Sequence, residues 1–249
     1  YAIGVISTLE PDKLIGLRKG SPLIVGLGKG ENFIASDIPA ILEYTKEFIT
    51  LDDEEIAVLT KDKVEVYDIY GNRKEKKPLT VNWDIAAAEK GGYKHFMLKE
   101  IYEQPKTIND TIAGFFSNLE NPVFRELDKI QNIVIVACGT SYHAGLVGKF
   151  WIEKFIKIPV IVDYASEIRY RDFPISENTL IIAISQSGET ADTRFAVIDA
   201  RKKGAKVLSI VNVVGSSLSR ESDYVLYTYC GPEIGVAATK TFTAQLITL

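Results

Sequence analysis

Two short segments rich in hydroxyl side chains and glycine carry the clearest chemical signal in this sequence. One is Cys138-Gly139-Thr140-Ser141, and the other is Ser185-Gln186-Ser187-Gly188-Glu189-Thr190. Each follows a continuous apolar run and stands directly before a segment with helical character. The first turn of a helix offers unpaired amide groups and a favourable dipole to an anion, and serine and threonine add neutral donors. The two segments therefore predict a phosphate-binding site in which Ser185, Ser187 and Thr190 are direct donors.

Ordinary helix capping is the alternative interpretation of a hydroxyl-rich loop. It suits a single loop better than two loops on equivalent strand ends. Two nucleotide-binding motifs are absent from the sequence, G-x-G-x-x-G after a strand and G-x-x-x-x-G-K-[ST]. The segment Gly26-Leu27-Gly28-Lys29-Gly30 resembles them only superficially, because it falls in a predicted hairpin.

A third segment follows the last predicted strand and opens a helix. It reads Gly231-Pro232-Glu233-Ile234-Gly235-Val236-Ala237-Ala238-Thr239-Lys240. This position allows the segment to line the same predicted pocket. The preceding Gly215-Ser216-Ser217 is interpreted as a structural turn.

Continuous apolar runs alternate with helical segments from about residue 105 onward. The predicted strands span residues 132–137, 160–163, 179–184, 205–211 and 224–229. The predicted helices span residues 144–157, 190–203 and 237 onward. Runs without polar alternation are typical of parallel strands that helices cover on both faces. The pattern predicts a doubly wound α/β domain with a parallel sheet, whose ligand binds beyond the carboxyl ends of the strands.

Residues 1–70 show short apolar runs separated by turn residues. Two hairpins are predicted, with turns at 28–30 and 61–63, and a helix is predicted over 38–48 with Asp37 and Pro39 as its start signal. Strands joined by hairpins form antiparallel sheets, so a partial antiparallel α+β domain is expected before the α/β domain. The helical stretch at 86–119 is the predicted connector, and the charged residues 73–77 are a predicted solvated loop.

Composition limits the classes of protein to which this chain can belong. Its 249 residues are 46% hydrophobic and 25% charged, which is typical of a soluble globular protein. No apolar run reaches the roughly 20 residues of a membrane-spanning helix. The net charge of −4 gives no excess of positive charge with which to bind nucleic acid. Two cysteines make no disulfide framework, and with two histidines they make a poor zinc site. We therefore expect a cytoplasmic protein without a bound metal.

The start of the chain is unusual. Tyr1 opens inside a predicted strand, and the only methionine is Met97. We therefore expect an internal piece of a longer protein.

The three loop segments closely resemble the first sugar-isomerase (SIS, phosphosugar-binding) domain of the glutamine:fructose-6-phosphate aminotransferase family. Earlier segments resemble the second half of that family's glutaminase domain and the connector beyond it: Ser21-Pro22-Leu23, Gly30-Glu31-Asn32-Phe33-Ile34-Ala35-Ser36-Asp37 and Lys99-Glu100-Ile101-Tyr102-Glu103-Gln104-Pro105. The resemblance covers essentially the whole chain in the right order. It implies the C-terminal part of an Ntn-hydrolase-like glutamine amidotransferase domain at residues 1–98, a helical connector at 99–121 and a first SIS domain, truncated at its end, at 122–249.

The resemblance also implies an activity for the complete enzyme. Members of the family make glucosamine 6-phosphate and glutamate from fructose 6-phosphate and glutamine, the first step of hexosamine synthesis, without a cofactor. The nucleophilic cysteine, the isomerisation base and the imine-forming lysine of the family lie outside this chain, so this piece is expected to be inactive alone. A homodimer that binds neither nucleic acid nor membrane is implied.

The resemblance carries site roles to matching positions of this chain. The implied sugar-phosphate ligands are Cys138, Gly139, Thr140, Ser141, Ser185, Gln186, Ser187, Thr190, Val236 and Ala237. At the last two, the backbone lines the sugar site. Ala238 departs from the serine often found at its position, so a hydroxyl contact is lost or replaced there. Asp37 resembles the acid that holds the α-amino group of glutamine, with a buried structural carboxylate as the alternative.

Other reactive side chains have simpler interpretations. Lys240 is expected on a helix surface, Cys138 in packing, and His143 in a first helical turn, although it could serve as a base. The carboxylates of Glu189 and Asp192 are expected to complement a helix dipole. Two other functions stay open: another phosphosugar isomerase or deglycase, and a sugar-phosphate-binding module without catalysis.

Overall fold

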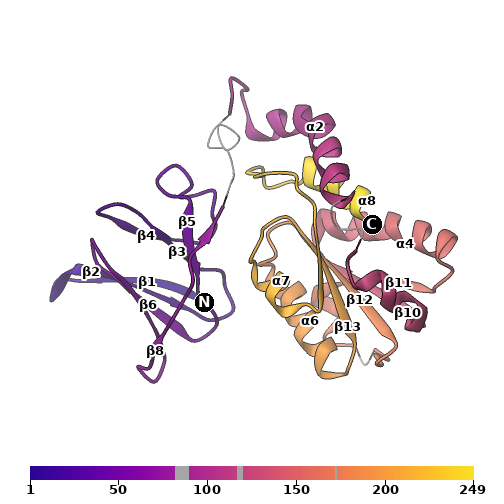
Figure 1. The fold of residues 1–249 in the computed structure, drawn as a ribbon, viewed down its shortest axis with the longest axis horizontal. Helices are drawn as coiled ribbons and strands as arrows, with labels where there is room; N and C mark the ends of the chain where they lie inside the picture. The colour runs from indigo at the N-terminus through magenta and orange to yellow at the C-terminus, as the bar shows by residue number, and fades with distance from the viewer. Residues whose placement is uncertain (82–89, 117–119, 172) are drawn as a thin grey trace. The chain divides into compact units, whose positions relative to one another are not determined.

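The computed structural model describes residues 1–81, 90–116, 120–171 and 173–249. The chain divides into two compact units, Tyr1–Glu89 and Lys90–Leu249 (Figure 1).

The second unit is built on a five-stranded parallel sheet. Its strands run in the order β11-β10-β12-β13-β14, and every neighbouring pair is parallel. The strands are β10 (Asn132–Ala137), β11 (Val160–Tyr164), β12 (Thr179–Ser185), β13 (Lys206–Val211) and β14 (Tyr224–Tyr227). All five predicted strands are therefore confirmed.

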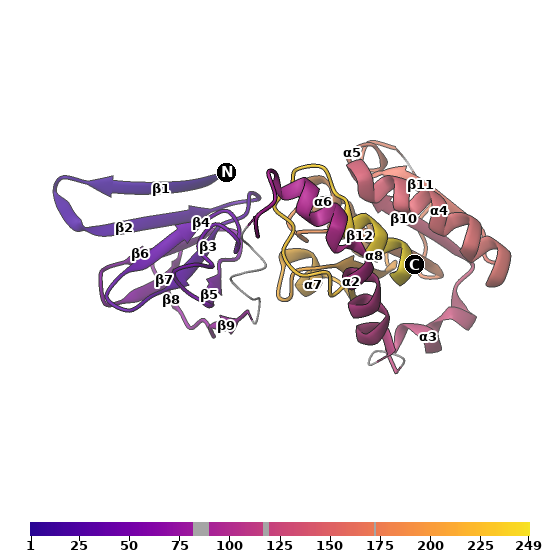
Figure 2. The ribbon, with the colours of Figure 1, turned by 90° about the horizontal axis from the view of Figure 1, so that it is seen from above.

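Helices cover both faces of this sheet (Figure 2). Alternate residues of β10 explain why: Ile133 and Ile135 belong to one apolar cluster, and Val134 and Val136 belong to another. The first cluster is closed by α4 (Gly139–Phe155) and α3 (Val123–Glu126), and the second by α5 (Ala165–Ile168), α6 (Ala191–Lys202) and α7 (Ser217–Glu221). Burial on both sides accounts for the continuous apolar runs. The doubly wound α/β prediction is confirmed.

Two helices far apart in the sequence lie side by side in this unit. Helix α2 (Phe96–Phe116) packs along α8 (Lys240–Thr248), as both views show. The predicted helical stretch at 86–119 contains α2, and its residues 86–89 and 117–119 lie outside the described residues. A short 3-10 helix, Leu127–Lys129, leads into β10.

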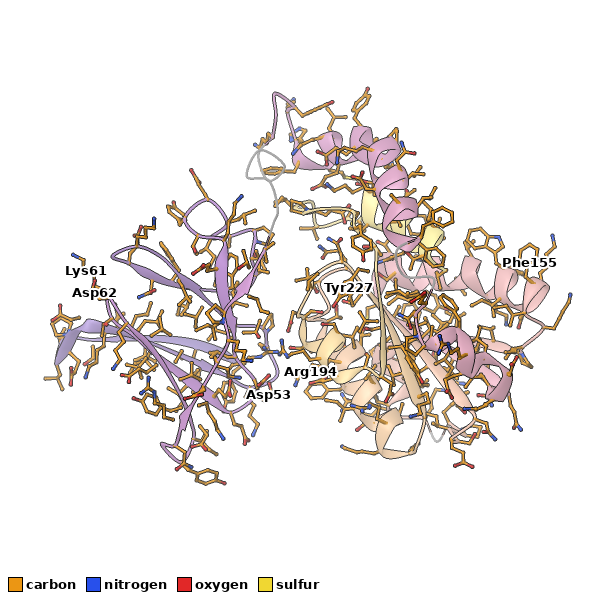
Figure 3. All side chains as sticks on the ribbon, in the orientation of Figure 1. Asp53, Lys61, Asp62, Phe155, Arg194 and Tyr227 are labelled. Atoms are coloured by element: carbon orange, nitrogen blue, oxygen red, sulfur yellow. The ribbon has the colours of Figure 1, made fainter. Side chains whose placement is uncertain are left out.

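Helix boundaries differ from prediction at two places. Helix α4 begins at Gly139 rather than near residue 144, and α8 begins at Lys240 rather than near residue 237. Cys138 is the N-cap residue of α4, with extended backbone angles. Thr140 and Ser141 consequently lie in the first turn of α4 and not in a loop before it. At the other end of α4, Phe155 is exposed (Figure 3).

The first unit contains two antiparallel sheets. One has the order β1-β2-β6-β7-β8 and the other β4-β3-β5-β9. The strands are β1 (Ala2–Ser7), β2 (Glu10–Arg18), β3 (Ile24–Leu27), β4 (Asn32–Ala35), β5 (Glu47–Thr50), β6 (Glu55–Leu59), β7 (Val64–Asp68), β8 (Arg73–Lys74) and β9 (Leu79–Thr80). Val25 and Ile49 of the second sheet share one apolar cluster with Ala57 and Val66 of the first, so the sheets pack face to face. The predicted antiparallel arrangement is confirmed.

Both predicted hairpins are present in this unit. Strands β3 and β4 pair up to Leu27 opposite Asn32, and β6 and β7 pair up to Leu59 opposite Val64. Lys61 in the second hairpin turn is labelled in Figure 3.

The helix predicted over residues 38–48 is wrong. The backbone forms turns, with hydrogen bonds from Ile41 N to Ile38 O and from Tyr44 N to Ile41 O, and β5 begins at Glu47. Phe48 must be extended because it pairs with Gly26 of β3. Tertiary pairing therefore overrides the helical spacing of the apolar residues, which is weak over so short a segment.

The charged stretch at 73–77 also differs from a plain solvated loop. Arg73 and Lys74 form β8 and pair with β7. Lys76 Nζ lies 2.7 Å from Asp52 Oδ2 and 2.6 Å from Glu55 Oε2.

Among the described residues, no helix is long and apolar enough to span a membrane.

Candidate functional site

The three predicted segments meet in one pocket at the carboxyl edge of the parallel sheet. Strands β10 and β12 are neighbours, whereas the chain's next strand after β10, β11, lies on the opposite side of β10. The strand order therefore reverses between β10 and β12, which is where open α/β sheets bind ligands. A pocket of about 280 Å³ lies here. Its lining consists of Cys138, Gly139, Thr140, Ser141, Ile184, Ser185, Gln186, Ser187, Thr190, Glu233, Gly235, Val236 and Ala238.

The first wall of the pocket is the start of α4. Gly139 has φ of 54°, a backbone conformation that favours glycine, and this turn lets the strand pass directly into the helix. No described side chain caps the helix at Cys138. The amides of its first turn therefore remain available to an anion.

The second wall is the tight loop between β12 and α6. Ser185 Oγ accepts a hydrogen bond from Gly188 N at 3.0 Å and lies 3.0 Å from Thr190 Oγ1. Ser187 Oγ accepts one from Glu189 N at 3.1 Å. Ser185 is only 3% exposed, so its hydroxyl orders the loop as well as lining the pocket.

Glu189 does not act as a simple dipole partner of α6. Its two carboxylate oxygens accept hydrogen bonds from Ser217 N at 2.7 Å and Ser217 Oγ at 2.8 Å. It thereby joins the β12–α6 loop to the start of α7. Asp192 does lie in the first turn of α6, as predicted, and the interpretation of residues 215–217 as a structural turn is consistent with these bonds.

The third wall is the segment between β14 and α8, where Glu233 holds the backbone in place. Glu233 Oε1 accepts hydrogen bonds from Thr239 N at 2.9 Å and Thr241 N at 3.3 Å, and Glu233 Oε2 accepts one from Thr241 Oγ1. Sequence reasoning missed this role. The available signal was an acid placed shortly before two threonines at a helix start.

Lys240 was expected on a helix surface, and that prediction is wrong. The side chain is buried, and its Nζ lies 2.6 Å from Glu103 Oε2 of α2. Lys99 Nζ lies 3.3 Å from the other oxygen of Glu103. Burial alone would raise the pKa of Glu103, but the hydrogen bond and charge of Lys240, with Lys99, hold it below its usual value.

Gln245 of α8 is a further residue that the sequence did not reveal. Its Nε2 donates a hydrogen bond to Ser141 Oγ at 3.0 Å. Because Ser141 is thereby an acceptor, its own proton remains available to a ligand in the pocket.

The remaining predicted site residues lie elsewhere. Ala237 is exposed and is not in the described lining of the pocket. Asp37 belongs to the first unit, is exposed, and accepts a hydrogen bond from Ala40 N at 3.1 Å. The alternative of a buried carboxylate at Asp37 is therefore wrong.

Cys138, Cys230 and His143 lie in the second unit. Cys138 is half-buried and packs against the α6 side of the sheet, as expected. Burial raises the pKa of Cys230 to about 12, so its thiol is protonated at neutral pH. His143 is exposed and is the fifth residue of α4, just beyond the predicted first-turn position.

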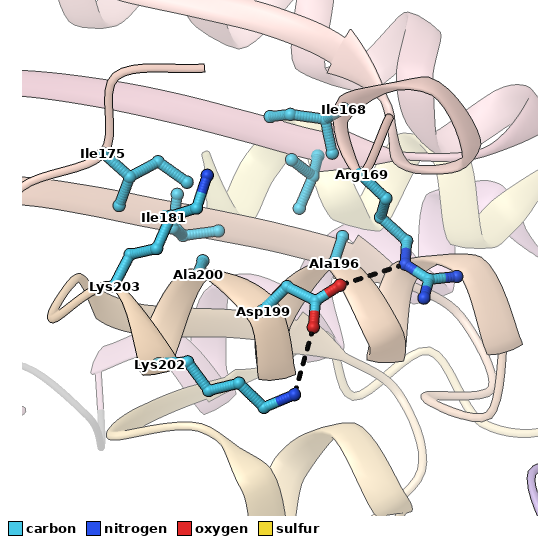
Figure 4. A pocket seen from close by; sticks show the side chains of 10 residues that line it. Ile168, Arg169, Ile175, Ile181, Ala196, Asp199, Ala200, Lys202 and Lys203 are labelled. Atoms are coloured by element: carbon cyan, nitrogen blue, oxygen red, sulfur yellow. Dashed lines mark hydrogen bonds and ion pairs between the residues drawn. The ribbon is translucent and has the colours of Figure 1, made fainter. Parts of the chain in front are cut away.

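A second cavity of about 250 Å³ lies between α5 and α6 (Figure 4). Its walls are mainly apolar, including Ile168, Ile175 and Ile181. At its rim, Asp199 pairs with Arg169 at 3.2 Å and with Lys202 at 3.3 Å. These charges largely satisfy one another, whereas the first pocket gathers several hydroxyls and a helix start.

Comparisons with known proteins agree with this geometry. Residues 126–249 match the SIS domain family. The C-terminal domain of glucosamine-fructose-6-phosphate aminotransferase from Francisella tularensis is 48% identical, with a TM-score of 0.62, over 64% of this chain and 47% of that chain. The parallel-sheet unit therefore contains a SIS domain.

Curated relatives match the whole of this chain. Glutamine–fructose-6-phosphate aminotransferase [isomerizing] from Aquifex aeolicus is 60% identical over all of this chain, and that from Caldanaerobacter subterraneus is 56% identical. Over its whole length the chain is therefore similar to glutamine–fructose-6-phosphate aminotransferases. It spans 42% of the length of these relatives.

Proposed function

We propose that this chain supplies the sugar-phosphate site of an enzyme that makes glucosamine 6-phosphate and glutamate from fructose 6-phosphate and glutamine. The observation that carries the proposal is the pocket between β10 and β12, where the start of α4 and the hydroxyls of the β12–α6 loop converge. The names of the relatives provide independent support.

The phosphate group is assigned to the two hydroxyl-rich walls. Amides of the first turn of α4, with Thr140 and Ser141, face it from one side. Ser187 and Thr190 face it from the other, with Gln186 beside them. Neutral donors and a helix dipole hold a phosphate without a fixed positive charge, so the product can also leave.

The sugar is assigned to the third wall. The backbone at Val236 would line it, with Ala237 beside it, and Ala238 presents a methyl group to the pocket. No cofactor is required, because the reaction moves an amide nitrogen and protons.

The first unit is proposed to belong to the glutamine-hydrolysing half of the enzyme. Asp37 would then hold the α-amino group of glutamine. As a solvent-exposed carboxylate at a turn, it is accessible to such a ligand. The boundaries proposed for the three parts are 1–98, 99–121 and 122–249.

We further propose that the enzyme is a cytoplasmic homodimer. Helix α4 exposes Phe150, Trp151 and Phe155, and exposed apolar surfaces of this kind are commonly covered at subunit interfaces. Light scattering at micromolar concentration should give twice the mass of one chain, and a monomer mass would contradict it.

Calorimetric titration with fructose 6-phosphate, glucosamine 6-phosphate and free phosphate tests the site. Ser187→Ala should weaken binding of the sugar phosphates about tenfold, because a hydrogen bond to a charged group is lost. The matched control is Ser166→Ala on α5, outside the pocket, which should change affinity less than about twofold. Absence of sugar-phosphate binding by the full-length wild-type protein would refute the proposal, and binding without turnover would favour a non-catalytic module.

A further inference from the structure

Glu100 of α2 is a buried carboxylate that faces the backbone of the third pocket wall. It is 2% exposed, and its Oε1 accepts hydrogen bonds from Ile234 N at 2.6 Å and Gly235 N at 3.0 Å. Gly235 itself lines the pocket. One side chain therefore binds two successive amides of the segment, across more than 130 positions of sequence.

The close approach depends on the glycine. A Cβ built at residue 235 would lie 2.5 Å from Glu100 Oε2, which is too short for a real contact. The carboxylate and the glycine thus fit each other, and a side chain at residue 235 would separate them.

Simple packing does not explain Glu100. Its Oε2 is buried without a hydrogen-bond partner among the described residues, and burying an incompletely paired carboxylate is costly. A residue of this kind is better explained by what it holds than by a gain in stability.

Neighbouring contacts fix α2 against the same region. Glu103 pairs with Lys240, and Gln104 Oε1 accepts a hydrogen bond from Thr243 Oγ1 at 2.6 Å. Residues 100, 103 and 104 occupy one face of a helix. The whole of this face is therefore directed at the pocket's third wall and the helix that follows it.

We infer that Glu100 is a positioning residue of the sugar-phosphate site. It holds the amides of Ile234 and Gly235, and so places the backbone at Val236 where the sugar binds. This inference rests on the proposed function for the identity of the ligand, but the contact between Glu100 and the segment does not.

Two measurements on the full-length protein test the inference with Glu100→Met, which removes both acceptor oxygens and nearly preserves the size of the side chain. The first is amide hydrogen exchange, in which Ile234 and Gly235 should lose protection about tenfold relative to wild type. The second is steady-state kinetics, in which KM for fructose 6-phosphate should rise about tenfold while KM for glutamine changes less than twofold. Asp110→Asn, an exposed carboxylate on the same helix, is the control and should change neither.

The outcomes separate this inference from the proposed function. Amide exchange in Glu100→Met equal to that of Asp110→Asn would overturn the inference, whatever the ligand. Faster exchange with an unchanged KM for fructose 6-phosphate would also overturn it, and so would an equal rise in both KM values. A wild-type protein that does not use fructose 6-phosphate would defeat the proposed function, and the exchange measurement would still decide whether Glu100 holds the segment.

Discussion

Gln245 Nε2 donates a hydrogen bond to Ser141 Oγ at 3.0 Å and so joins the last helix of the chain to the first wall of the pocket. The two residues are 104 positions apart. This bond decides which way the serine hydroxyl points its proton, because an oxygen that already accepts from an amide is oriented to donate elsewhere.

Reversing this bond should weaken binding of the ligand. In Gln245→Glu the carboxylate accepts the proton of Ser141 and adds a negative charge near the phosphate position. We expect the Kd for fructose 6-phosphate to rise more than about tenfold, as measured by calorimetry. Gln131→Glu, exposed before β10, adds the same charge away from the pocket and should have little effect. Equal affinities for the two variants would contradict the assignment.

The ion pair between Lys240 and Glu103 should contribute to stability. Lys240→Met leaves Glu103 with Lys99 as its remaining cation, so we expect a loss of about 2 kcal/mol in the free energy of unfolding, less than for a fully buried pair. Urea denaturation measures this loss. The control is Lys106→Met, which removes an exposed pair with Asp110 on the same helix and should cost at most about 0.5 kcal/mol. A loss no greater than the control's would mean that the pair is energetically neutral.

Glu103 should also make stability depend on acid pH. Its pKa is held below the usual 4.5 in the folded state, so its contribution is present above the unfolded pKa. That contribution is lost as the pH falls through the folded pKa. The free energy of unfolding of wild type should therefore fall toward that of Glu103→Gln as the pH is lowered from 6 to 3 (roughly the range that carboxyl titration covers). A difference that stays constant over this range would argue against the shift.

The loop between β12 and α6 should not tolerate a side chain at Gly188. Its φ is 66°, and a Cβ there would lie 2.2 Å from Ser216 Oγ. Gly188→Ala should therefore lower the free energy of unfolding by about 2–4 kcal/mol and weaken ligand binding, because the clash adds to the backbone strain. At Gly204 φ is 92° and nothing lies within 4 Å of a Cβ, so Gly204→Ala isolates the strain and should cost about 1 kcal/mol. Similar costs for both variants would show that the loop adjusts.

The local sequence pattern predicted much of the fold and the position of the pocket. Residues 133–137 are apolar at every position, as a strand covered on both faces requires. Glycine and hydroxyl residues follow β10 and β12 directly, so the pocket could be predicted at the strand ends. The resemblance of these segments to a known family then indicated the ligand.

Pattern failed where distant pairing decides local structure. Residues 38–48 have helical spacing but form turns, because Phe48 must be extended to pair with β3. Lys240 looks like a surface residue in sequence, yet α2 covers it and supplies Glu103.

The sequence by itself determined the parallel sheet, its order of strands and helices along the chain, and the loops that form two walls of the pocket, because those features depend on periodicity and on residues next to one another. Only the tertiary structure showed that Glu100 binds the amide of Ile234, that Glu103 binds Lys240 and that Gln245 binds Ser141. Their partners lie more than 100 positions away, and no local preference specifies which distant atoms a buried polar group will bind.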